Sequence, residues 1–178
     1  MTVTINGNGT ITPTSAVQPT GSILQVIQTK LNTVVSIQGV ESYTDISGFS
    51  AAITPSSASS KILVMVQMNV STSSETYFQL ARTAAGSTSA IGNGSAGNYN
   101  SFTGIFGSTA RSGHYDFQDK NFNFLDDAQD ANEHTYKVQW ANVGTTITTY
   151  LNRTAYSTTS TSFSYSGASS ITLMEVAG

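Results

Sequence analysis

The sequence predicts an all-β protein, an antiparallel β-sandwich of jelly-roll type. The segment Lys61–Val70 (KILVMVQMNV) has an apolar residue at every even position, and this period of two is that of a β-strand. Roughly eight to ten short segments of strand-like pattern follow one another along the chain, as in sandwich folds. No segment keeps the apolar period of about 3.6 residues with capping residues, so we expect little helix.

The first part of the chain, residues 1–21, is predicted as an N-terminal arm or linker that precedes a sandwich domain at residues 22–178. Two Asn-Gly dipeptides predict turns, and Pro13 and Pro19 interrupt regular structure. Two interpretations remain open: a loosely ordered terminus, or an attachment arm that becomes ordered on a neighbouring subunit. In the second interpretation, assembly would use a short strand made of Thr2, Val3, Thr4 and Ile5.

The first half of the sandwich domain contains six predicted strands, each bounded by turn residues. The strand Lys61–Val70 is expected at the centre of a sheet, with its even-numbered side chains in the core. Its odd-numbered face carries Leu63 and Met65, which pack either within the protomer or against a neighbouring subunit. The other predicted strands are Ser22–Gln28, Thr33–Gln38, Ser42–Ile46, Phe49–Ile53 and Thr76–Thr83.

The second half of the domain begins with a segment rich in Gly, Ser and Asn at residues 84–101, predicted as a long exposed loop or a weak hairpin. Further on, the sequence NVGT indicates a hairpin turn at Gly144. Aromatic residues are dense between positions 99 and 124; most are expected in the core, with a subunit interface or a sugar-stacking surface as alternatives. The predicted strands of this half are Ser101–Phe106, Phe117–Leu125, His134–Ala141, Thr145–Asn152 and Ser170–Val176.

The charge and composition of the chain exclude several classes of function. The net charge is -3 and the Lys and Arg residues are scattered singly, so binding of a nucleic-acid backbone is not expected. The chain has no cysteine, which excludes disulfides and thiolate metal sites. No apolar run approaches the roughly 20 residues that cross a membrane, and the N-terminus lacks the features of a secretory signal. We therefore expect synthesis in the cytoplasm, no membrane insertion and a working place that lies elsewhere.

Carboxylates are concentrated in one window, residues 116–133, which holds six of the ten acidic residues. Clustered carboxylates suit a hard cation such as calcium, although the spacing is not that of an EF-hand. Ordinary turn chemistry explains the same cluster, because Asp and Asn favour loops. The sequence otherwise predicts no metal and no cofactor, and the calcium candidates are Asp126, Asp127 and Asp130.

The sequence contains no motif of an enzyme. His114 and His134 lie on separate predicted elements without a metal-binding spacing, and both are expected at the surface or at a strand edge. The serines form no G-x-S-x-G elbow, and there is no phosphate-binding loop or dinucleotide fingerprint. The sequence therefore predicts a protein that is not an enzyme. A hydrolase that uses the carboxylates of residues 116–133 is the third alternative.

Five stretches are characteristic of this chain: GSILQVIQTK, YTDISGFSAAITPSSASSKILVMVQMNVS, YKVQWAN, YLNRTAYS and SSITLMEVAG. Together they resemble a family of small virion-surface β-proteins of tailed bacteriophages, often met as tail-fibre or fibre-like C-terminal domains. The resemblance covers about residues 21–178, and its more specific parts are the run ITPSSASSKILV and the ending SITLME. These parts mark the fold family rather than one biochemical role.

The resemblance implies a non-enzymatic structural protein of a phage virion, a homotrimer that is displayed on the particle surface and bound to other virion proteins. As a small fibre or fibre tip, it would touch a glycan or protein of the host surface with its loops. As a capsid decoration (cement) protein, it would clamp capsomers, with residues 1–21 as an arm. The composition, in which only 10% of residues are charged, suits assembly at many copies. It also fits a non-viral carbohydrate-binding β-sandwich module, the alternative from another class.

Overall fold

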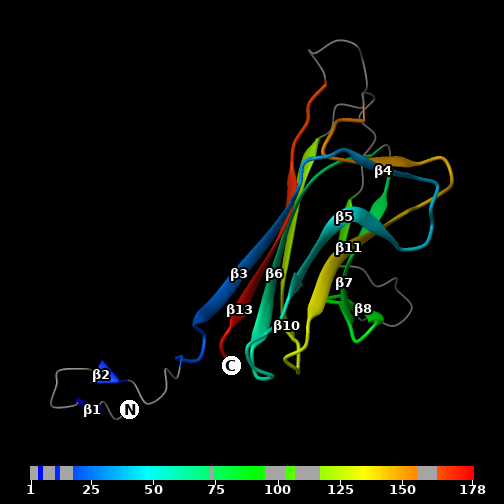
Figure 1. Cartoon of the computed structure of the whole chain (residues 1–178). Coiled ribbons are helices and arrows are strands. Elements are labelled where there is room, and N and C mark those ends of the chain that lie inside the picture. Colours follow the sequence, from blue (N-terminus) through cyan, green and yellow to red (C-terminus); the bar gives the residue numbers. More distant parts are fainter. Residues whose placement is uncertain are drawn as a thin grey trace.

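β-strands form all the regular structure in the residues that the computed structural model describes, which are 18–72, 74–94, 103–106, 117–155 and 164–178. Two further strands, β1 (Thr4–Ile5) and β2 (Ile11–Thr12), are described nearer the N-terminus. The main strands form two antiparallel sheets that pack face to face, and Figure 1 shows them as the two layers of a sandwich. This arrangement confirms the predicted all-β sandwich.

The first sheet is organised around β6, the strand predicted to be central. One edge of β6 pairs with β10, and the other edge pairs first with β13 and, further along, with β12. The sheet continues from β13 to β3 and from β12 to β4. Its strands are β3 (Ile23–Leu31), β4 (Val35–Gln38), β6 (Lys61–Thr72), β10 (Gln118–Asp127), β12 (Thr148–Leu151) and β13 (Ser169–Val176).

The second sheet has the order β5-β11-β7-β8, and the short β9 also pairs with β7. Its strands are β5 (Thr44–Ile53), β7 (Thr76–Ala84), β8 (Ser87–Ile91), β9 (Gly104–Phe106) and β11 (His134–Asn142). In the first sheet the main strands run in the order β3-β13-β6-β10. The order β3-β13-β6-β10 therefore packs against the order β5-β11-β7-β8, and the chain crosses repeatedly between the two sheets, as in the predicted jelly roll.

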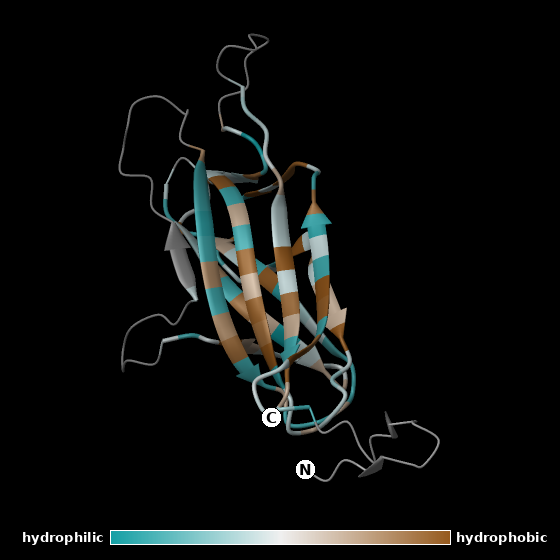
Figure 2. Ribbon diagram, turned by 90° about the vertical axis from the view of Figure 1, so that its left-hand side faces the viewer, coloured by the Kyte–Doolittle hydropathy of each residue, from teal (hydrophilic) through white to brown (hydrophobic). Residues whose placement is uncertain are grey.

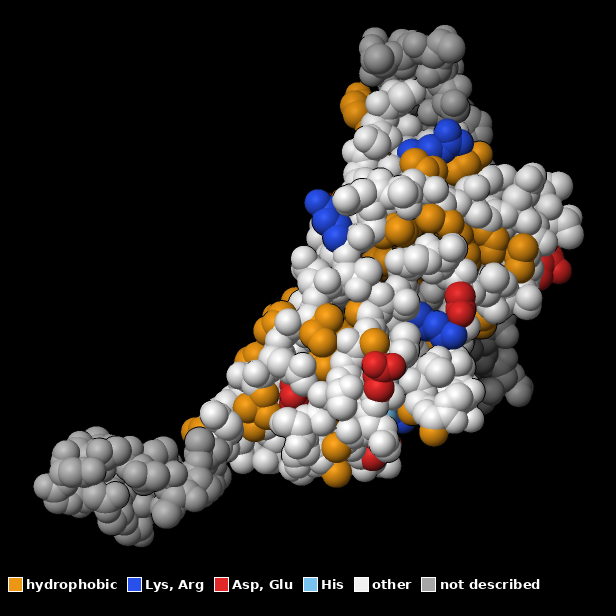
Figure 3. Space-filling model, in the orientation of Figure 1, with side chains coloured by type: hydrophobic (Ala, Val, Ile, Leu, Met, Phe, Trp, Pro, Cys, Tyr) orange, Lys and Arg blue, Asp and Glu red, His pale blue; other side chains and the backbone are white. Residues whose placement is uncertain are grey.

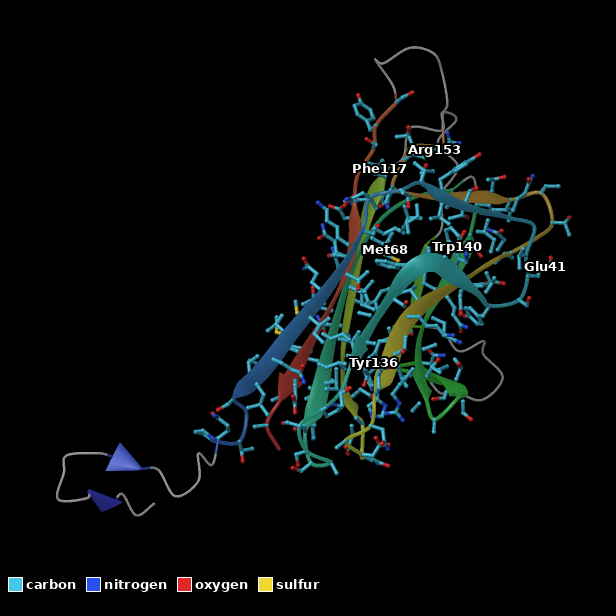
Figure 4. All side chains as sticks on the ribbon, viewed as in Figure 1. Glu41, Met68, Phe117, Tyr136, Trp140 and Arg153 are labelled. Atoms are coloured by element: carbon cyan, nitrogen blue, oxygen red, sulfur yellow. The ribbon has the colours of Figure 1, made fainter. Side chains whose placement is uncertain are left out.

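The hydrophobic core lies between the two sheets. The even-numbered side chains of β6 from Ile62 to Val70 point into it and are at most 3% exposed, as predicted for this strand. From the second sheet, Tyr136, Val138 and Trp140 of β11 pack into the same core. Figure 4 shows Tyr136 and Trp140 directed into the space between the sheets. Each such side chain contributes roughly 1.5–3 kcal/mol when it is fully buried.

Strand β5 joins two segments that the sequence pattern predicts as separate strands, Ser42–Ile46 and Phe49–Ile53; that prediction is wrong. Gly48 lies between them with a φ of 72°, and the register of β5 against β11 shifts in the same region. A β-bulge with glycine at positive φ adds residues to one strand without ending it. The break in the alternation at Gly48 therefore marks a bulge, whereas the pattern alone suggests the end of a strand.

Residues 84–101, predicted as a loop or a weak hairpin, contain a hairpin in the part that the structure describes. Strand β7 turns into β8 at Ala85 and Gly86, which have φ angles of 48° and 79°. Positive φ at both central residues is the requirement of a two-residue hairpin turn of type I′. Residues 95–102 lie outside the described part of the chain.

The predicted hairpin at Gly144 is wrong. The strand before it, β11, belongs to the second sheet, and the strand after it, β12, belongs to the first. Gly144 has a φ of 113°, so it supplies a sharp change of direction in a connection that crosses from one sheet to the other. The other predicted strands are present, with ends that differ by a few residues.

The N-terminal segment forms its own small element. Strands β1 and β2 pair with each other and with neither sheet, and Figure 1 draws them outside the sandwich. Of the predicted assembly strand, Thr4 and Ile5 form β1, whereas Thr2 and Val3 lie outside the described residues. The role of this segment as an attachment arm stays a prediction.

The chain enters the sandwich beside its own C-terminal end. The Gly21 amide donates to the Ala177 carbonyl at 2.8 Å, and the Ala177 amide donates to the Ser22 carbonyl at 2.8 Å. The point at which the predicted arm meets the predicted domain is therefore hydrogen-bonded to the end of β13.

Glu175 of β13 is a buried carboxylate that holds the loop after β5. It accepts hydrogen bonds from the Ser56 amide at 2.7 Å, from the Ser56 hydroxyl at 2.6 Å and from Gln25 Nε2 at 2.7 Å. Gln25 Nε2 also donates to the Thr54 carbonyl at 2.8 Å. Burial alone would raise the pKa of Glu175, but these hydrogen bonds favour the charged form and together lower the pKa below its ordinary value of 4.5.

We expect Glu175→Gln to remove part of the acid sensitivity of folding. A carboxyl whose pKa is lower in the folded state stabilises the protein above its unfolded pKa, and this stability is lost as the pH falls through the folded pKa. At pH 7 the variant should lose about 2 kcal/mol of unfolding free energy. Urea unfolding at pH 7 and near pH 3 should show this difference shrinking at the lower pH. Glu133→Gln, at an exposed position, is the matched control, and an equal loss at both pH values would contradict the assignment.

Candidate assembly face

The outer face of the first sheet carries a continuous row of apolar side chains. The strand register places Leu63 of β6 between Met174 of β13 and Leu125 of β10, and it places Met174 beside Val26 of β3. Val26 is 56% exposed and Leu125 is 47% exposed, while the two residues between them are half-buried. One apolar row therefore crosses four neighbouring strands on the side of the sheet that faces away from the core.

Three further apolar residues extend this row on both sides. Met65, 42% exposed, lies next along β6, between Thr172 and Asn123. At the other side, Ile23 is 50% exposed and pairs with Val176. We name the whole set the apolar outer face; it consists of Ile23, Val26, Leu63, Met65, Leu125, Met174 and Val176.

Figure 2 shows the strands that carry this face, and Figure 3 shows part of the surface itself. In Figure 2 hydrophobic bands on neighbouring strands of the first sheet lie side by side, and in Figure 3 hydrophobic side chains gather along the flank formed by β3 and β13. A sheet face that meets only water usually carries polar residues, in alternation with the buried ones. A contiguous exposed apolar patch is instead typical of a surface that binds another molecule.

A polar groove adjoins the apolar outer face. It has a volume of about 370 Å³, and Met65 lines it together with the side chains of Gln28, Gln67, Asn123 and Thr172. Gln28 Nε2 donates to Thr172 Oγ1 at 2.8 Å across β3 and β13. Amide groups supply both donors and acceptors, so this groove can form hydrogen bonds around an apolar contact.

The apolar outer face contains no charged side chain, and the nearest ones mark its border. Lys61 and Asp127 occupy opposite positions of β6 and β10 at one end. Lys30 of β3 lies on the other side, beyond Gln28. An apolar centre with polar and charged residues at the rim is the arrangement of a protein–protein interface, because charges are costly to desolvate.

Of the predicted assembly residues in this sheet, Leu63 and Met65 both lie on the apolar outer face. Met174 and Val26 complete the row but come from strands distant in the sequence. The signal for Met174 and Val26 in the sequence is the polar-apolar alternation in SSITLMEV and ILQVIQTK. This alternation does not show which strands become neighbours in the sheet.

The predicted calcium candidates point in different directions. Asp126 is 6% exposed and lies between the sheets, where its Oδ2 accepts hydrogen bonds from Arg82 Nη1 at 2.7 Å and from the Tyr136 hydroxyl at 2.8 Å. Asp127 follows it on β10 and is exposed, on the other face of the strand. Burial and the neighbouring Asp126 carboxylate raise the pKa of Tyr136, so its hydroxyl remains a donor.

The third candidate, Asp130, lies in the loop between β10 and β11. Its Oδ1 accepts a hydrogen bond from the Asn132 amide at 2.7 Å, which lowers the pKa of Asp130, and it lies 3.1 Å from His134 Nε2. Within the described residues, no group of three His, Cys, Asp or Glu side chains is placed to hold a metal ion. The structure therefore does not bring the three calcium candidates together.

The expectation that His134 lies at the surface or at a strand edge is wrong, because its side chain is fully buried at the start of β11, an interior strand of the second sheet. His114 lies outside the described residues. Sequence reasoning also missed a cleft beside Tyr43 and Tyr77 and a buried polar hub at Asn152. Their polar partners come from strands far apart in sequence, so a local pattern carries little signal of them.

The fold and this face together define a jelly-roll sandwich with one apolar outer sheet surface. Comparison with models of known protein families finds no match for the chain. A search of curated proteins likewise finds no significant sequence relative. In the part of the chain that the structure describes, no helix has the length and apolarity needed to cross a membrane.

Proposed function

We propose that this protein is a structural protein of a phage virion, displayed on the particle surface as a homotrimer. It acts by protein–protein assembly, either as a small fibre or fibre tip or as a capsid decoration protein. The observation that carries the proposal is the apolar outer face, in which Val26, Leu63, Leu125 and Met174 form one row across four strands. The proposal also uses the resemblance of the sequence to virion-surface β-proteins.

A second copy of the chain is the occupant that best fits the apolar outer face. The face spans four neighbouring strands, and its rim carries both charge signs at Lys61 and Asp127. Covering it with identical subunits removes apolar surface from water, which contributes about 25 cal/mol per Å². Homo-oligomers with closed symmetry are the commonest assemblies of soluble proteins, and a trimer is one of these closed forms.

Two features support a place on a virion. Jelly rolls form capsid domains of viruses as well as lectin domains, which is an analogy of fold and not of site. The N-terminal hairpin β1–β2 pairs with neither sheet, so it is available to bind a neighbouring virion protein. An arm of this kind favours the decoration role, whereas the loops at the ends of the sandwich would serve a fibre tip that touches the host surface.

Light scattering of the purified protein tests the assembly. We expect a particle of about three times the chain mass of 18.7 kDa at micromolar concentration. The double variant Met65→Lys/Leu125→Lys should be a folded monomer, because each exposed lysine would have to be buried unpaired in the interface. Ala52→Lys, an exposed position on the outer face of the second sheet, is the matched control and should remain a trimer.

A wild-type monomer, or a double variant that assembles like the wild type, would contradict the use of this face. The virion location has its own test. An antibody against the protein, followed by electron microscopy of purified phage particles, should label the capsid or the tail. Particles that contain no protein reacting with the antibody would refute the virion role.

A further inference from the structure

A second surface of the molecule has the features of a small-ligand site. A cleft of about 350 Å³ opens where the second sheet meets the loop before β5 and the loop after β11. Tyr43 and Glu41 line it from the first of these loops, Tyr77 from β7, and Asn142 from the end of β11. Figure 4 shows Glu41 at the end of the sandwich remote from β3, so the cleft is separate from the apolar outer face.

The two tyrosines give the cleft apolar rings with hydroxyl tips. Both are half-buried, and burial together with the neighbouring Tyr77 raises the pKa of Tyr43, so the Tyr43 hydroxyl stays neutral. Aromatic rings offer flat apolar contact at a small cost in conformational entropy, and their hydroxyls bond to polar groups of a ligand.

Asn142 supplies a buried polar group with an unused acceptor. It is 2% exposed, and its Nδ2 donates to Thr149 Oγ1 at 2.9 Å, but its Oδ1 has no hydrogen-bond partner among the described residues. A buried acceptor without a partner costs about 1–3 kcal/mol, so it is normally satisfied by something else. Asn142 Oδ1 is shielded from solvent, so this acceptor lies beneath the surface of the cleft.

The wall of the cleft is held in place before any ligand arrives. The Asn142 amide donates to the Val40 carbonyl at 2.7 Å, and the Val143 amide donates to the Glu75 carbonyl at 3.2 Å. These bonds tie the end of β11 to the two loops beside it. A preorganised wall reduces the entropy lost when a ligand binds.

A ladder of polar side chains continues from the cleft across the outer face of the second sheet. Asn93 Nδ2 donates to Gln79 Oε1 at 3.1 Å, and Gln79 Nε2 donates to Gln139 Oε1 at 2.9 Å. Gln139 Nε2 then donates to Asp45 Oδ1 at 2.7 Å, and Lys137 Nζ donates to Asp45 Oδ2 at 2.8 Å. Gln79 lies two residues from Tyr77 on the same face of β7, so the ladder begins beside the tyrosines.

We infer that the Tyr43–Tyr77 cleft binds a neutral saccharide, with one sugar ring against the tyrosines and the next along the amide ladder. Sugar rings present C–H faces that pack on aromatic rings and hydroxyls that bond to amides and carboxylates. The volume lies at the low end of ligand sites, which suits one or two sugar units. The Glu41 carboxylate at the cleft disfavours sialylated or uronic sugars by charge repulsion.

This inference rests on the proposed function in one respect, because it names a host-surface glycan as the partner of the displayed protein. The binding itself does not depend on assembly. The cleft and the apolar outer face lie on different sheets, so their substitutions can be tested separately.

Calorimetric titration of the intact protein tests the site with neutral oligosaccharides that end in glucose, galactose or N-acetylglucosamine, and with a sialylated oligosaccharide. We expect binding of at least one neutral probe and at least tenfold weaker binding of the sialylated one. Tyr77→Ala should weaken binding of the neutral probe at least tenfold, whereas Tyr77→Phe should retain most of it. Glu41→Lys, at an exposed position, should reverse the preference toward the sialylated probe and is expected to fold normally.

Failure to bind every neutral probe at millimolar concentration would overturn the inference, as would unchanged binding in both Tyr77→Ala and Glu41→Lys. If Tyr77→Ala does not fold, the altered preference of Glu41→Lys decides alone. The double variant Met65→Lys/Leu125→Lys should still bind sugar as a monomer. A protein that assembles but binds no sugar refutes only this inference, and a monomer that binds sugar refutes only the proposed assembly.

Discussion

Replacing Asp126 by Ala is expected to destabilise the protein by about 3 kcal/mol, because the partly buried Arg82 guanidinium and the buried Tyr136 hydroxyl lose their shared acceptor. Asp126 comes from β10 of the first sheet, whereas Arg82 and Tyr136 come from β7 and β11 of the second. The carboxylate lies 2.7 Å from Arg82 Nη1 and 2.8 Å from the Tyr136 hydroxyl. Arg82 Nη1 also donates to the Asp127 carbonyl at 3.1 Å. This group of side chains therefore links the two sheets, and removing the Asp126 carboxylate leaves the Tyr136 hydroxyl without this acceptor and Arg82 with the Asp127 carbonyl alone.

Urea unfolding at a fixed protein concentration measures this loss, since assembly makes the apparent stability depend on concentration. Asp127→Ala is the matched control, because it makes the same substitution one residue along the same strand at an exposed side chain. Its free energy of unfolding should change by no more than about 0.5 kcal/mol. Tyr136→Phe removes one donor and should cost about 1 kcal/mol. Equal stability of the Asp126 and Asp127 variants would show that the buried group contributes little.

Replacing Asn152 by Ala is expected to cost about 4 kcal/mol. Asn152 is fully buried, its Nδ2 donates to the carbonyls of Leu31 at 2.8 Å and Thr33 at 2.9 Å, and its Oδ1 accepts from the Ser169 hydroxyl at 2.6 Å. Its amide donates to the Asn69 carbonyl at 2.8 Å. One residue thus joins the end of β12 to β3, β6 and β13. Losing three buried side-chain hydrogen bonds accounts for about 3 kcal/mol of the expected effect.

The rest of the cost comes from the backbone, because Asn152 has a φ of 67°. Asparagine and glycine tolerate this left-handed conformation, whereas it destabilises alanine by about 1 kcal/mol. Asn152→Gly should therefore be about 1 kcal/mol more stable than Asn152→Ala, while Ser169→Ala, which removes one of the bonds, should cost about 1 kcal/mol. Chemical unfolding of the three variants measures both contributions, with Asn132→Ala at an exposed loop as the control. A loss below 1 kcal/mol in Asn152→Ala would refute the hub.

Much of the fold is predictable because it depends on local patterns. The alternation in Lys61–Val70 predicts a strand with one buried face, and the structure buries every even-numbered side chain of it. The shared face of Tyr136, Val138 and Trp140 follows from the same rule. Period-two burial is a property of a single strand, so it can be read before the partner strands are known.

The errors occur where the meaning of a local signal depends on a distant partner. Glycine at positive φ suits a turn, a bulge and a crossing between sheets equally well. Gly48 lies in a bulge because β11 pairs with both halves of β5, and Gly144 lies in a crossing because β12 pairs with β4 and β6. The turn residues are visible in the sequence, but the pairing that decides between these outcomes is not.

The candidate sites likewise consist of residues that the sequence singles out and residues that only the strand pairing brings beside them. The odd-numbered face of β6 singles out Leu63 and Met65, but Val26, Met174 and Leu125 join them only through the register of four strands. The window at residues 116–133 shows clustered carboxylates, yet the strand alternation turns Asp126 inward to Arg82 and leaves Asp127 outside. Proximity along the chain is therefore a poor guide to proximity of side chains in a sandwich.

The sequence by itself determined the all-β class, the central strand, its buried face and the low charge of the surface, because each depends on side chains one or two residues apart. Tertiary structure alone decided the strand order, the row that makes the apolar outer face, the Tyr43–Tyr77 cleft and the buried hub at Asn152. In a jelly roll, neighbouring strands come from distant parts of the chain. Surfaces and buried polar groups that span several strands exist only once those strands have paired.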